Sequence, residues 1–358
     1  MSAIISWQPN ESSDQVLRHL ANGDCVALPT ESTYEVVASA LHPAAVARLR
    51  CVDAAPAIVL NDYAALVDWL PLLRGAAARL FRKLGPGPVV LSADAGFRSG
   101  LWARLPDGVR APLVQEGRLA VRWPAHPIWD KLRQANLPLV SVPLHIAKIA
   151  AEAAQCAGDA VACIVDGGPS EFGIPATVVR AEGRQCRLTR EGGLPRELFE
   201  RLVLCRVLFI CTGNTCRSPL AQALCTKLLA DRLGCAPRDL SQHDFLVQSA
   251  GLAAMMGGDA SPAAVDVAKE LGADLSEHKS TMATMELLRW ADYVFSMTSS
   301  HWYTLLSVAP AGVAEPRMLS PQFQDISDPI GGELADYRTC AQQILECLEQ
   351  RLPELLES

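Results

Sequence analysis

Residues 207–219 constrain the fold more than any other part of the chain. Their sequence, VLFICTGNTCRSP, is an apolar run that ends in Cys211, then a short polar loop that contains Arg217, then a Ser-Pro pair that begins at Ser218. The apolar run predicts a buried parallel strand. The Ser-Pro pair predicts the N-cap and first residue of a helix that continues over residues 220–233. The chain therefore passes from strand to loop to helix here, as it does in α/β folds.

A loop in this position is suited to bind an anion. Its backbone N–H groups point inward at the positive end of the helix dipole. Such surroundings favour the thiolate form of Cys211, and a thiolate is the species that attacks phosphorus. Arg217 can hold two oxygens of a phosphoryl group with its planar guanidinium, which lysine could not reproduce. The alternative is that Cys211 is a small core residue at a strand end, which leaves Arg217 without a role.

The loop resembles that of the low-molecular-weight protein tyrosine phosphatase family, which has the sequence CxGNxCRSP and is followed much later by an Asp-Pro pair. Other matches follow in the expected order: Ser249-Ala250-Gly251, His278, Ala291-Asp292 and Asp328-Pro329. The resemblance covers residue 204 to the end of the chain. It implies a Rossmann-like domain with a parallel sheet over residues 204–358.

The same resemblance implies a role for each matching residue. Cys211 would be the nucleophile, Arg217 the phosphate clamp and Asp328 the general acid, which then activates the water that hydrolyses the phosphocysteine. Ser218 would stabilise the thiolate. The phosphate-binding loop comprises Thr212, Gly213, Asn214, Thr215, Cys216 and Ser218. This chemistry needs no metal and no cofactor. Taken alone, Asp-Pro is a common turn pair, and His278 either braces the loop or is an ordinary hydrogen-bonded histidine.

Thr215 bears on the choice of substrate. Within the family, a bulky aliphatic residue just before the second cysteine resembles tyrosine phosphatases, whereas threonine there resembles bacterial protein-arginine phosphatases. A hydroxyl at this place could bond a guanidinium nitrogen or a bridging water. Residues 329–332, PIGG, lack the tyrosines that line the aryl pocket of many tyrosine-directed members. We expect a phosphorylated protein substrate, phosphoarginine or phosphotyrosine, and favour phosphoarginine, although Thr215 can equally just pack the loop.

The other cysteines bear on two questions: whether the domain could reduce arsenate, and whether Cys211 has a redox partner. Arsenate reduction on this scaffold needs two relay cysteines, and residues 251–318 contain none. Cys340 and Cys347 lie seven apart, as expected for the core-facing stripe of an amphipathic helix. Cys216 could trap oxidised Cys211 as a reversible disulfide, or it could be a small residue that packs the loop. Both interpretations of Cys216 stay open.

Length and composition bound the remaining possibilities. A chain of 358 residues suggests two domains. It has no apolar run of about eighteen residues to span a membrane and does not begin like a signal peptide. The twelve cysteines lack a repeated spacing and form no CxxC or Cys/His zinc pattern. We therefore expect a cytoplasmic protein without a metal.

Charge divides unevenly between the two halves. Residues 1–200 carry 20 basic and 20 acidic side chains, whereas residues 201–358 carry 12 basic and 19 acidic ones. An acidic surface disfavours nucleic acid and suits a basic protein substrate. We expect the domain boundary within residues 198–205.

The first two hundred residues mix short helices and strands, which predicts an α/β domain with a twisted sheet. Helices are expected over residues 14–22, 43–50, 63–73 and 75–84, and strands over 25–28, 57–60, 89–92 and 119–122. Five segments resemble the threonylcarbamoyl-AMP synthase (YrdC-like) family: LPTESTY at 28–34, GPGPV at 85–89, LAVR at 119–122, LPLVSV at 137–142 and REG at 190–192. That family uses threonine, bicarbonate and ATP to make an intermediate of tRNA modification.

The N-terminal domain, residues 1–200, departs from that family where its chemistry should be. Glu35 replaces a glycine, residues 50–55 lack the Lys-x-Arg that holds ATP phosphates, and VPLH at 142–145 replaces a Ser/Thr-Ser-Ala-Asn motif. Each lost charge-assisted hydrogen bond costs about 1.5–3 kcal/mol, so we expect a degenerate domain. The retained residues Thr30, Arg122 and Arg190 form a candidate site for a nucleotide or threonine, although a structural remnant is favoured.

The sequence thus predicts a fusion of a degenerate YrdC-like domain to a cysteine-dependent protein phosphatase. Two other functions remain as alternatives. One is a threonylcarbamoyl-AMP synthase-type nucleotidyltransferase, with the N-terminal domain as the main actor. The other is a phosphoprotein-binding module without catalysis.

Overall fold

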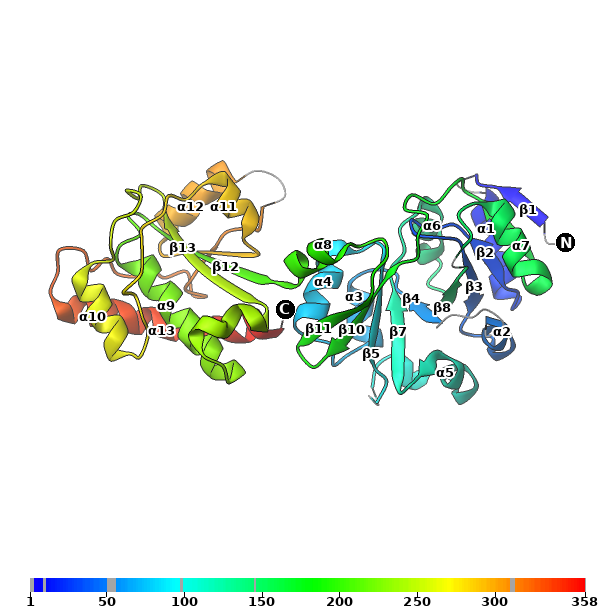
Figure 1. Cartoon of the computed structure of the whole chain (residues 1–358), viewed down its shortest axis with the longest axis horizontal. Helices are drawn as coiled ribbons and strands as arrows, with labels where there is room; N and C mark the ends of the chain where they lie inside the picture. The colour runs from blue at the N-terminus through cyan, green and yellow to red at the C-terminus, as the bar shows by residue number, and fades with distance from the viewer. Residues whose placement is uncertain are drawn as a thin grey trace. The chain divides into compact units, whose positions relative to one another are not determined.

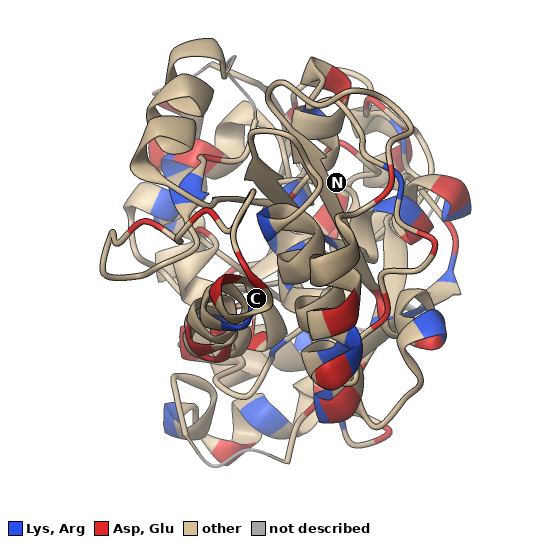
Figure 2. Cartoon of the chain, turned by 90° about the vertical axis from the view of Figure 1, so that its left-hand side faces the viewer, with Lys and Arg blue, Asp and Glu red and all other residues tan. Residues whose placement is uncertain are grey.

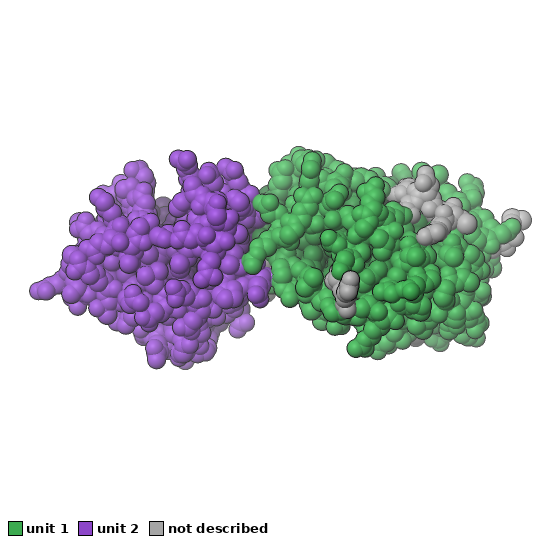
Figure 3. Space-filling model, turned by 90° about the horizontal axis from the view of Figure 1, so that it is seen from below, with its two compact units in different colours: residues 1–203 green, residues 204–358 purple. Residues whose placement is uncertain are grey.

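The computed structural model describes residues 3–8, 11–49, 56–96, 99–144, 146–309 and 313–357. The chain divides into two compact units, residues 1–203 and 204–358 (Figures 1 and 3). Both units combine helices with a sheet, which confirms the predicted α/β fold class. The predicted loss of the Lys-x-Arg motif falls on residues 50–55, and part of the VPLH segment falls on His145. Both lie outside the described residues.

The first unit is built on a mixed sheet. Its described strands are ordered β1-β9-β2-β3-β8-β4-β7-β5-β10-β11, and β6 pairs with β7. Their bounds are β1 Ala3–Ser6, β2 Val26–Leu28, β3 Glu35–Ser39, β4 Ala57–Val59, β5 Val89–Asp94, β6 Val114–Gln115, β7 Arg118–Arg122, β8 Leu139–Pro143, β9 Cys163–Asp166, β10 Thr177–Glu182 and β11 Gln185–Arg190. The four strands predicted from the sequence are present within two residues at each end.

Helices of the first unit bury two apolar clusters against this sheet. The α-helices are α1 Glu11–Ala21, α2 Pro43–Arg48, α3 Ala64–Trp69, α4 Ala76–Leu84, α5 Asp107–Leu113, α6 Pro127–Gln134, α7 Ala150–Ala157 and α8 Arg196–Val203. The prediction of one helix over residues 63–73 is wrong at its C-terminal end, where the observed helix α3 stops at Trp69. Leu70 leaves the helical conformation, with φ −128° and ψ 68°, since the following Pro71 disfavours a helical backbone at the residue before it.

The second unit is a parallel sheet covered by helices, as predicted. Its described strands are ordered β13-β12-β14-β15, and every pairing is parallel. The strands are β12 Cys205–Cys211, β13 Phe245–Gly251, β14 Tyr293–Ser296 and β15 Arg317–Met318, and the α-helices are α9 Arg217–Leu233, α10 Pro262–Glu270, α11 Met285–Trp290, α12 Ser299–Val308 and α13 Leu334–Glu357. Basic and acidic positions are interspersed along the helices (Figure 2).

The central strand β12 explains the apolar run that dominates the sequence. Val207 and Phe209 belong to one buried cluster, whereas Leu208 and Ile210 belong to another. Alternate side chains of a strand point to opposite faces of the sheet, so β12 is covered on both faces and its positions from 207 to 210 are all apolar. The strand delivers Cys211 to the carboxyl edge of the sheet, where ligands bind in parallel α/β folds.

The longest helix, α13, places Cys340 and Cys347 in the core, 0% and 8% exposed. Their predicted place on a core-facing stripe is confirmed. Burial raises the pKa of the Cys340 thiol to about 12, so this thiol stays protonated and unreactive at neutral pH. Among the described helices, none combines the length and the apolar character needed to cross a membrane.

Candidate active site

The loop after β12 lies against the end of β13 because of Gly251. The strand register pairs Cys211 with Gly251. A Cβ atom at Gly251 would stand 2.5 Å from the Thr212 carbonyl oxygen and 2.9 Å from the Asn214 nitrogen. Only a residue without a side chain permits this approach. The glycine of the Ser-Ala-Gly match therefore gives the loop the space it needs.

Cys211 lies at the base of this loop, only 2% exposed. Its Sγ atom is 2.9 Å from Ser218 Oγ and accepts a hydrogen bond from the Asn214 N–H at 3.2 Å. The Asn214 N–H is the donor in the second contact, whereas either Ser218 Oγ or Cys211 Sγ could donate in the first. The role of Ser218 as a group that stabilises the thiolate stays a prediction.

The predicted start of the following helix is wrong. Helix α9 begins at Arg217 with Cys216 in the cap position, and Ser218 lies inside the first turn. The Ser218 hydroxyl contacts Cys211 Sγ and accepts from Asn214 Nδ2, so it does not cap the helix. The other end agrees with the prediction, because α9 ends at Leu233 before Gly234, which has φ +69°.

Asn214 ties the loop to the rest of the unit. Its side-chain nitrogen donates to Ser218 Oγ and Ser249 Oγ, both at 2.9 Å. Its Oδ1 accepts from the Thr281 N–H at 2.8 Å, and its carbonyl oxygen lies 2.8 Å from His278 Nε2. Asn214 is fully buried and adopts φ +55°, which asparagine tolerates better than most residues. Of the two interpretations of His278, the structure supports the brace.

Arg217 and Asp328 meet, although 111 positions separate them in the sequence. Arg217 Nη2 lies 2.6 Å from Asp328 Oδ2, and the two side chains are 7% and 43% exposed. The predicted clamp and the predicted acid are therefore in direct contact. A phosphoryl group bound in the loop would compete with this carboxylate for the guanidinium.

Cys216 is surrounded by hydroxyl groups. Its Sγ lies 3.4 Å from Ser261 Oγ, 3.5 Å from the Tyr337 hydroxyl and 3.6 Å from Thr215 Oγ1. Both Cys211 and Cys216 are free thiols here. Burial raises the pKa of Tyr337 above its usual value, so this phenol stays protonated. The redox and packing interpretations of Cys216 both remain predictions.

His301 is a part of the site that the sequence analysis missed. It lies on α12, 6% exposed, with Nε2 2.8 Å from Thr212 Oγ1 and Nδ1 2.8 Å from Thr298 Oγ1. Burial and the nearby charge of Arg217 lower the pKa of His301, against an opposing effect of Asp328. The His301 ring is therefore neutral when it contacts the Thr212 hydroxyl. The pattern Thr298-x-x-His301 after a buried strand is a helix-cap signal and was the available clue.

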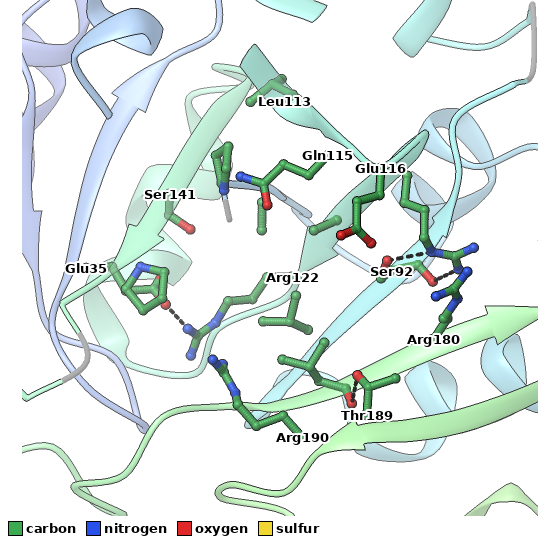
Figure 4. A pocket seen from close by; sticks show the side chains of 17 residues that line it. Glu35, Ser92, Leu113, Gln115, Glu116, Arg122, Ser141, Arg180, Thr189 and Arg190 are labelled. Atoms are coloured by element: carbon green, nitrogen blue, oxygen red, sulfur yellow. Dashed lines mark hydrogen bonds and ion pairs between the residues drawn. The ribbon is translucent and has the colours of Figure 1, made fainter. Parts of the chain in front are cut away.

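In the first unit, two of the three predicted ligand residues, Thr30 and Arg122, are in direct contact. Arg122 Nη2 lies 3.2 Å from Thr30 Oγ1 and 2.6 Å from Glu31 Oε1, and the guanidinium also forms an ion pair with Glu35. Arg190 comes from another strand and lines the same cavity as Arg122 and Glu35 (Figure 4). Thr30 does not line that cavity.

This cavity of about 430 Å³ contains several arginines (Figure 4). They come from β7, β10 and β11: Arg118, Arg122, Arg180 and Arg190. Burial lowers the pKa of Arg118 and Arg190, and the charge of Arg180 adds to the effect at Arg118. Two carboxylates, Glu31 and Glu35, share the buried Arg122.

Comparisons with known proteins find a matching family for each of the two parts of the chain. Residues 206–358 match the family described as low molecular weight phosphotyrosine protein phosphatase. Residues 18–192 match the Sua5/YciO/YrdC family, described as telomere recombination.

Three relatives illustrate these matches. A protein-arginine-phosphatase of Geobacillus stearothermophilus is 36% identical over 157 residues, which cover 43% of this chain and 97% of that protein. A probable low molecular weight protein-tyrosine-phosphatase, EpsP, of Ralstonia nicotianae is 31% identical over 150 residues, or 42% of this chain and 94% of that protein. A threonylcarbamoyl-AMP synthase of Pyrococcus abyssi is 30% identical over 200 residues, 51% of this chain but only 55% of that protein.

The lowered pKa of His301 predicts how acid affects the second unit. Between the folded pKa and the ordinary value near 6.5, the unfolded chain binds more protons at this residue, so the free energy of unfolding rises with pH. We expect the opening free energy of β12 and α9, measured by hydrogen exchange, to fall from pH 7.5 to pH 5.5. His301→Gln, which cannot titrate, should show a smaller fall.

Burial also lowers the pKa of His126 in the first unit. His126→Gln therefore serves as the matched control, and it should leave the fall in β12 and α9 unchanged. An equal fall in wild type and His301→Gln would contradict the assignment.

Proposed function

The chain belongs, through residues 206–358, to the low-molecular-weight phosphotyrosine protein phosphatase family, and on this premise we propose that Cys211, Arg217 and Asp328 carry out its cysteine-dependent reaction. One observation carries the assignment. Cys211 Sγ lies at the base of the loop, with the Ser218 hydroxyl at 2.9 Å and the Asn214 N–H at 3.2 Å. We propose residues 204–358 as the phosphatase domain and residues 1–200 as the YrdC-like domain.

In the first step, the phosphoryl group of the substrate enters the loop and Arg217 exchanges Asp328 for two phosphoryl oxygens. The Cys211 thiolate attacks phosphorus, so that a P–S bond forms while the bond from phosphorus to the leaving oxygen or nitrogen breaks. Asp328, released from Arg217, takes up a proton from solvent and gives it to the leaving group. The products of this step are a phosphocysteine and the dephosphorylated side chain.

In the second step, the Asp328 carboxylate takes a proton from a water molecule, which attacks phosphorus. The P–S bond breaks and inorganic phosphate leaves. Ser218 and the Asn214 N–H stabilise the departing thiolate, since both already contact Sγ. Asp328 releases the proton that it took from water to solvent, and its carboxylate then pairs again with Arg217.

The direct contact between Arg217 and Asp328 favours catalysis over a binding module. A module that only binds phosphoprotein would need Asp328 to be misplaced. The carboxylate instead lies 2.6 Å from the clamp, 43% exposed, where both a leaving group and water can reach it.

For the substrate, we favour phosphoarginine in a protein. Thr215 is half-buried in the loop, with its hydroxyl 3.6 Å from Cys216 Sγ. The residue after Asp328-Pro329 is Ile330, 69% exposed, in place of an aromatic side chain. The relative from Geobacillus stearothermophilus, a protein-arginine-phosphatase, supports this preference.

For the first unit, we propose that Glu35 takes the place of a ligand anion on Arg122. Its carboxylate is fully buried, lines the cavity and forms an ion pair with that guanidinium. An internal anion in this position disfavours a nucleotide triphosphate and so disfavours the synthase-type activity. Arg190, which donates to the Ala176 carbonyl at 3.3 Å, still offers a charge for a small ligand.

Asp328→Asn should lower kcat by about 10²–10⁴, the usual contribution of a general acid and base. The loss should be largest for a substrate with a poor leaving group, because that step depends most on the donated proton. Steady-state turnover of an aryl and an alkyl phosphate measures it. Asp266→Asn, at an exposed position of α10, is the matched control. Full turnover of the alkyl phosphate by Asp328→Asn would remove the assignment.

Thr215→Ile should shift the substrate preference from phosphoarginine toward phosphotyrosine. Loss of one hydrogen bond to the guanidinium corresponds to about a ten-fold fall in the kcat/KM ratio. Matched phosphoarginine and phosphotyrosine peptides measure the ratio, and Cys211→Ser provides the blank. An unchanged ratio in Thr215→Ile would leave the phosphoarginine preference without a basis.

Glu35→Gly should allow anions to bind to Arg122 in the cavity. Calorimetric titration with pyrophosphate and with ATP is expected to show binding to Glu35→Gly and to Glu35→Gln, which keeps the side-chain volume. Glu116→Gln, another acidic residue that lines the cavity, is the control and should behave like wild type. Equal binding of ATP by wild type and Glu35→Gly would contradict the proposal.

A further inference from the structure

Three aromatic rings lie together on the surface of the second unit. The Trp302 ring is 4.9 Å from the Tyr303 ring and 5.9 Å from the Phe323 ring, centroid to centroid. Trp302 is fixed by its Nε1, which donates to the Pro316 carbonyl at 2.8 Å. Tyr303 and Phe323 remain 65% and 68% exposed. We call these three residues the aromatic cluster.

The backbone displays Phe323 instead of burying it. Its φ is +58°, a conformation that costs energy for a bulky residue and persists where the surroundings impose it. The Phe323 N–H donates to the Ser320 carbonyl at 3.2 Å, and the Gln324 N–H donates to Ser320 Oγ at 3.2 Å. The turn therefore holds the ring in solvent next to Trp302.

Both segments that carry the cluster also carry residues of the phosphatase site. His301, the neighbour of Trp302 on α12, contacts Thr212 of the phosphate-binding loop at 2.8 Å. Phe323 precedes the proposed acid Asp328 by five positions. The Asp325 carboxylate joins the two segments, because its Oδ1 accepts from the Ser299 N–H at 2.7 Å.

Acidic residues outnumber basic ones in the segments that carry the cluster. Residues 299–336 contain five acidic side chains, namely Glu315, Asp325, Asp328, Glu333 and Asp336, and one basic side chain, Arg317. Arg317 lies over the buried rings of Tyr293 and Phe295, at 5.3 and 5.5 Å, and forms an ion pair with Glu354. Exposed aromatic faces beside carboxylates attract guanidinium and ammonium groups.

We propose that the aromatic cluster, together with Asp325, is a docking surface for a basic side chain that flanks the phosphorylated residue of a protein substrate. The proposal rests on the phosphatase function proposed above and adds a preference for basic sequence. An extended peptide advances about 3.3 Å per residue, so a residue two to four positions from the phosphorylated one reaches out of the loop to its border. Arginine suits the surface better than lysine, since its planar group stacks on aromatic rings.

Binding to the full-length Cys211→Ser variant tests docking apart from chemistry. Two phosphotyrosine peptides are compared by fluorescence anisotropy, one with arginines at the flanking positions and one with glutamines. We expect the arginine peptide to bind more tightly. Phe323→Asn, which suits a positive φ, and Tyr303→Ala should each reduce this ratio of Kd values by about three- to ten-fold. Val308→Ala removes an exposed side chain at the far end of α12 and should leave the ratio unchanged.

The ratio compares two peptides on the same variant, so a general effect on the loop cancels. An unchanged ratio in both aromatic variants, or tighter binding of a leucine-flanked peptide than of the arginine peptide, would overturn the proposal. Turnover of p-nitrophenyl phosphate by wild type tests the phosphatase function separately. Its absence together with an intact preference for arginine would refute the catalytic assignment and leave the docking surface standing.

Discussion

The buried side chain of Asn214 is the contact on which the phosphatase site depends. Its amide joins Ser218 of the first helical turn, Ser249 of β13 and the backbone of Thr281. Leaving a buried donor or acceptor of this amide without a partner would lower the free energy of unfolding by about 1–3 kcal/mol. The folded loop therefore needs all of these hydrogen bonds. They fix the curve of the loop, and that curve directs the Asn214 N–H at the Cys211 sulfur. Chemistry at sulfur thus depends on a group that never touches substrate.

Local sequence patterns predicted the strand and the loop. They could not predict contacts between segments that are distant in the sequence. The apolar run of β12 and the spacing of Cys211 and Arg217 follow from neighbouring residues. Asp328 was found through a family resemblance, because nothing local distinguishes it from a turn. His301 was missed since its partner Thr212 lies 89 positions away. The N-cap prediction for Ser218 failed because a sulfur atom competes for the same hydroxyl.

The first unit shows how a buried arginine can find its counter-charge within the chain. Arg122 remains at the centre of the sheet, fully buried, and it still needs counter-charge. Glu31 and Glu35 supply that charge from within the chain. The family resemblance indicated that Glu35 stands in place of a glycine. Only the structure shows that the Glu35 carboxylate reaches Arg122. The same carboxylate that satisfies the buried guanidinium is the one that we propose to occupy the place of a ligand anion.

The contact between Arg217 and Asp328 also sets a threshold for what can occupy the loop. A carboxylate tethered in the same chain acts as an internal competitor, with an effective concentration on the order of millimolar or higher. A dilute, weakly held anion cannot displace it, whereas a phosphoryl group that also gains the loop N–H groups can. In the proposed mechanism, the same competition helps to expel inorganic phosphate after each cycle. The exchange of partners on Arg217 would thus return the site to its starting state.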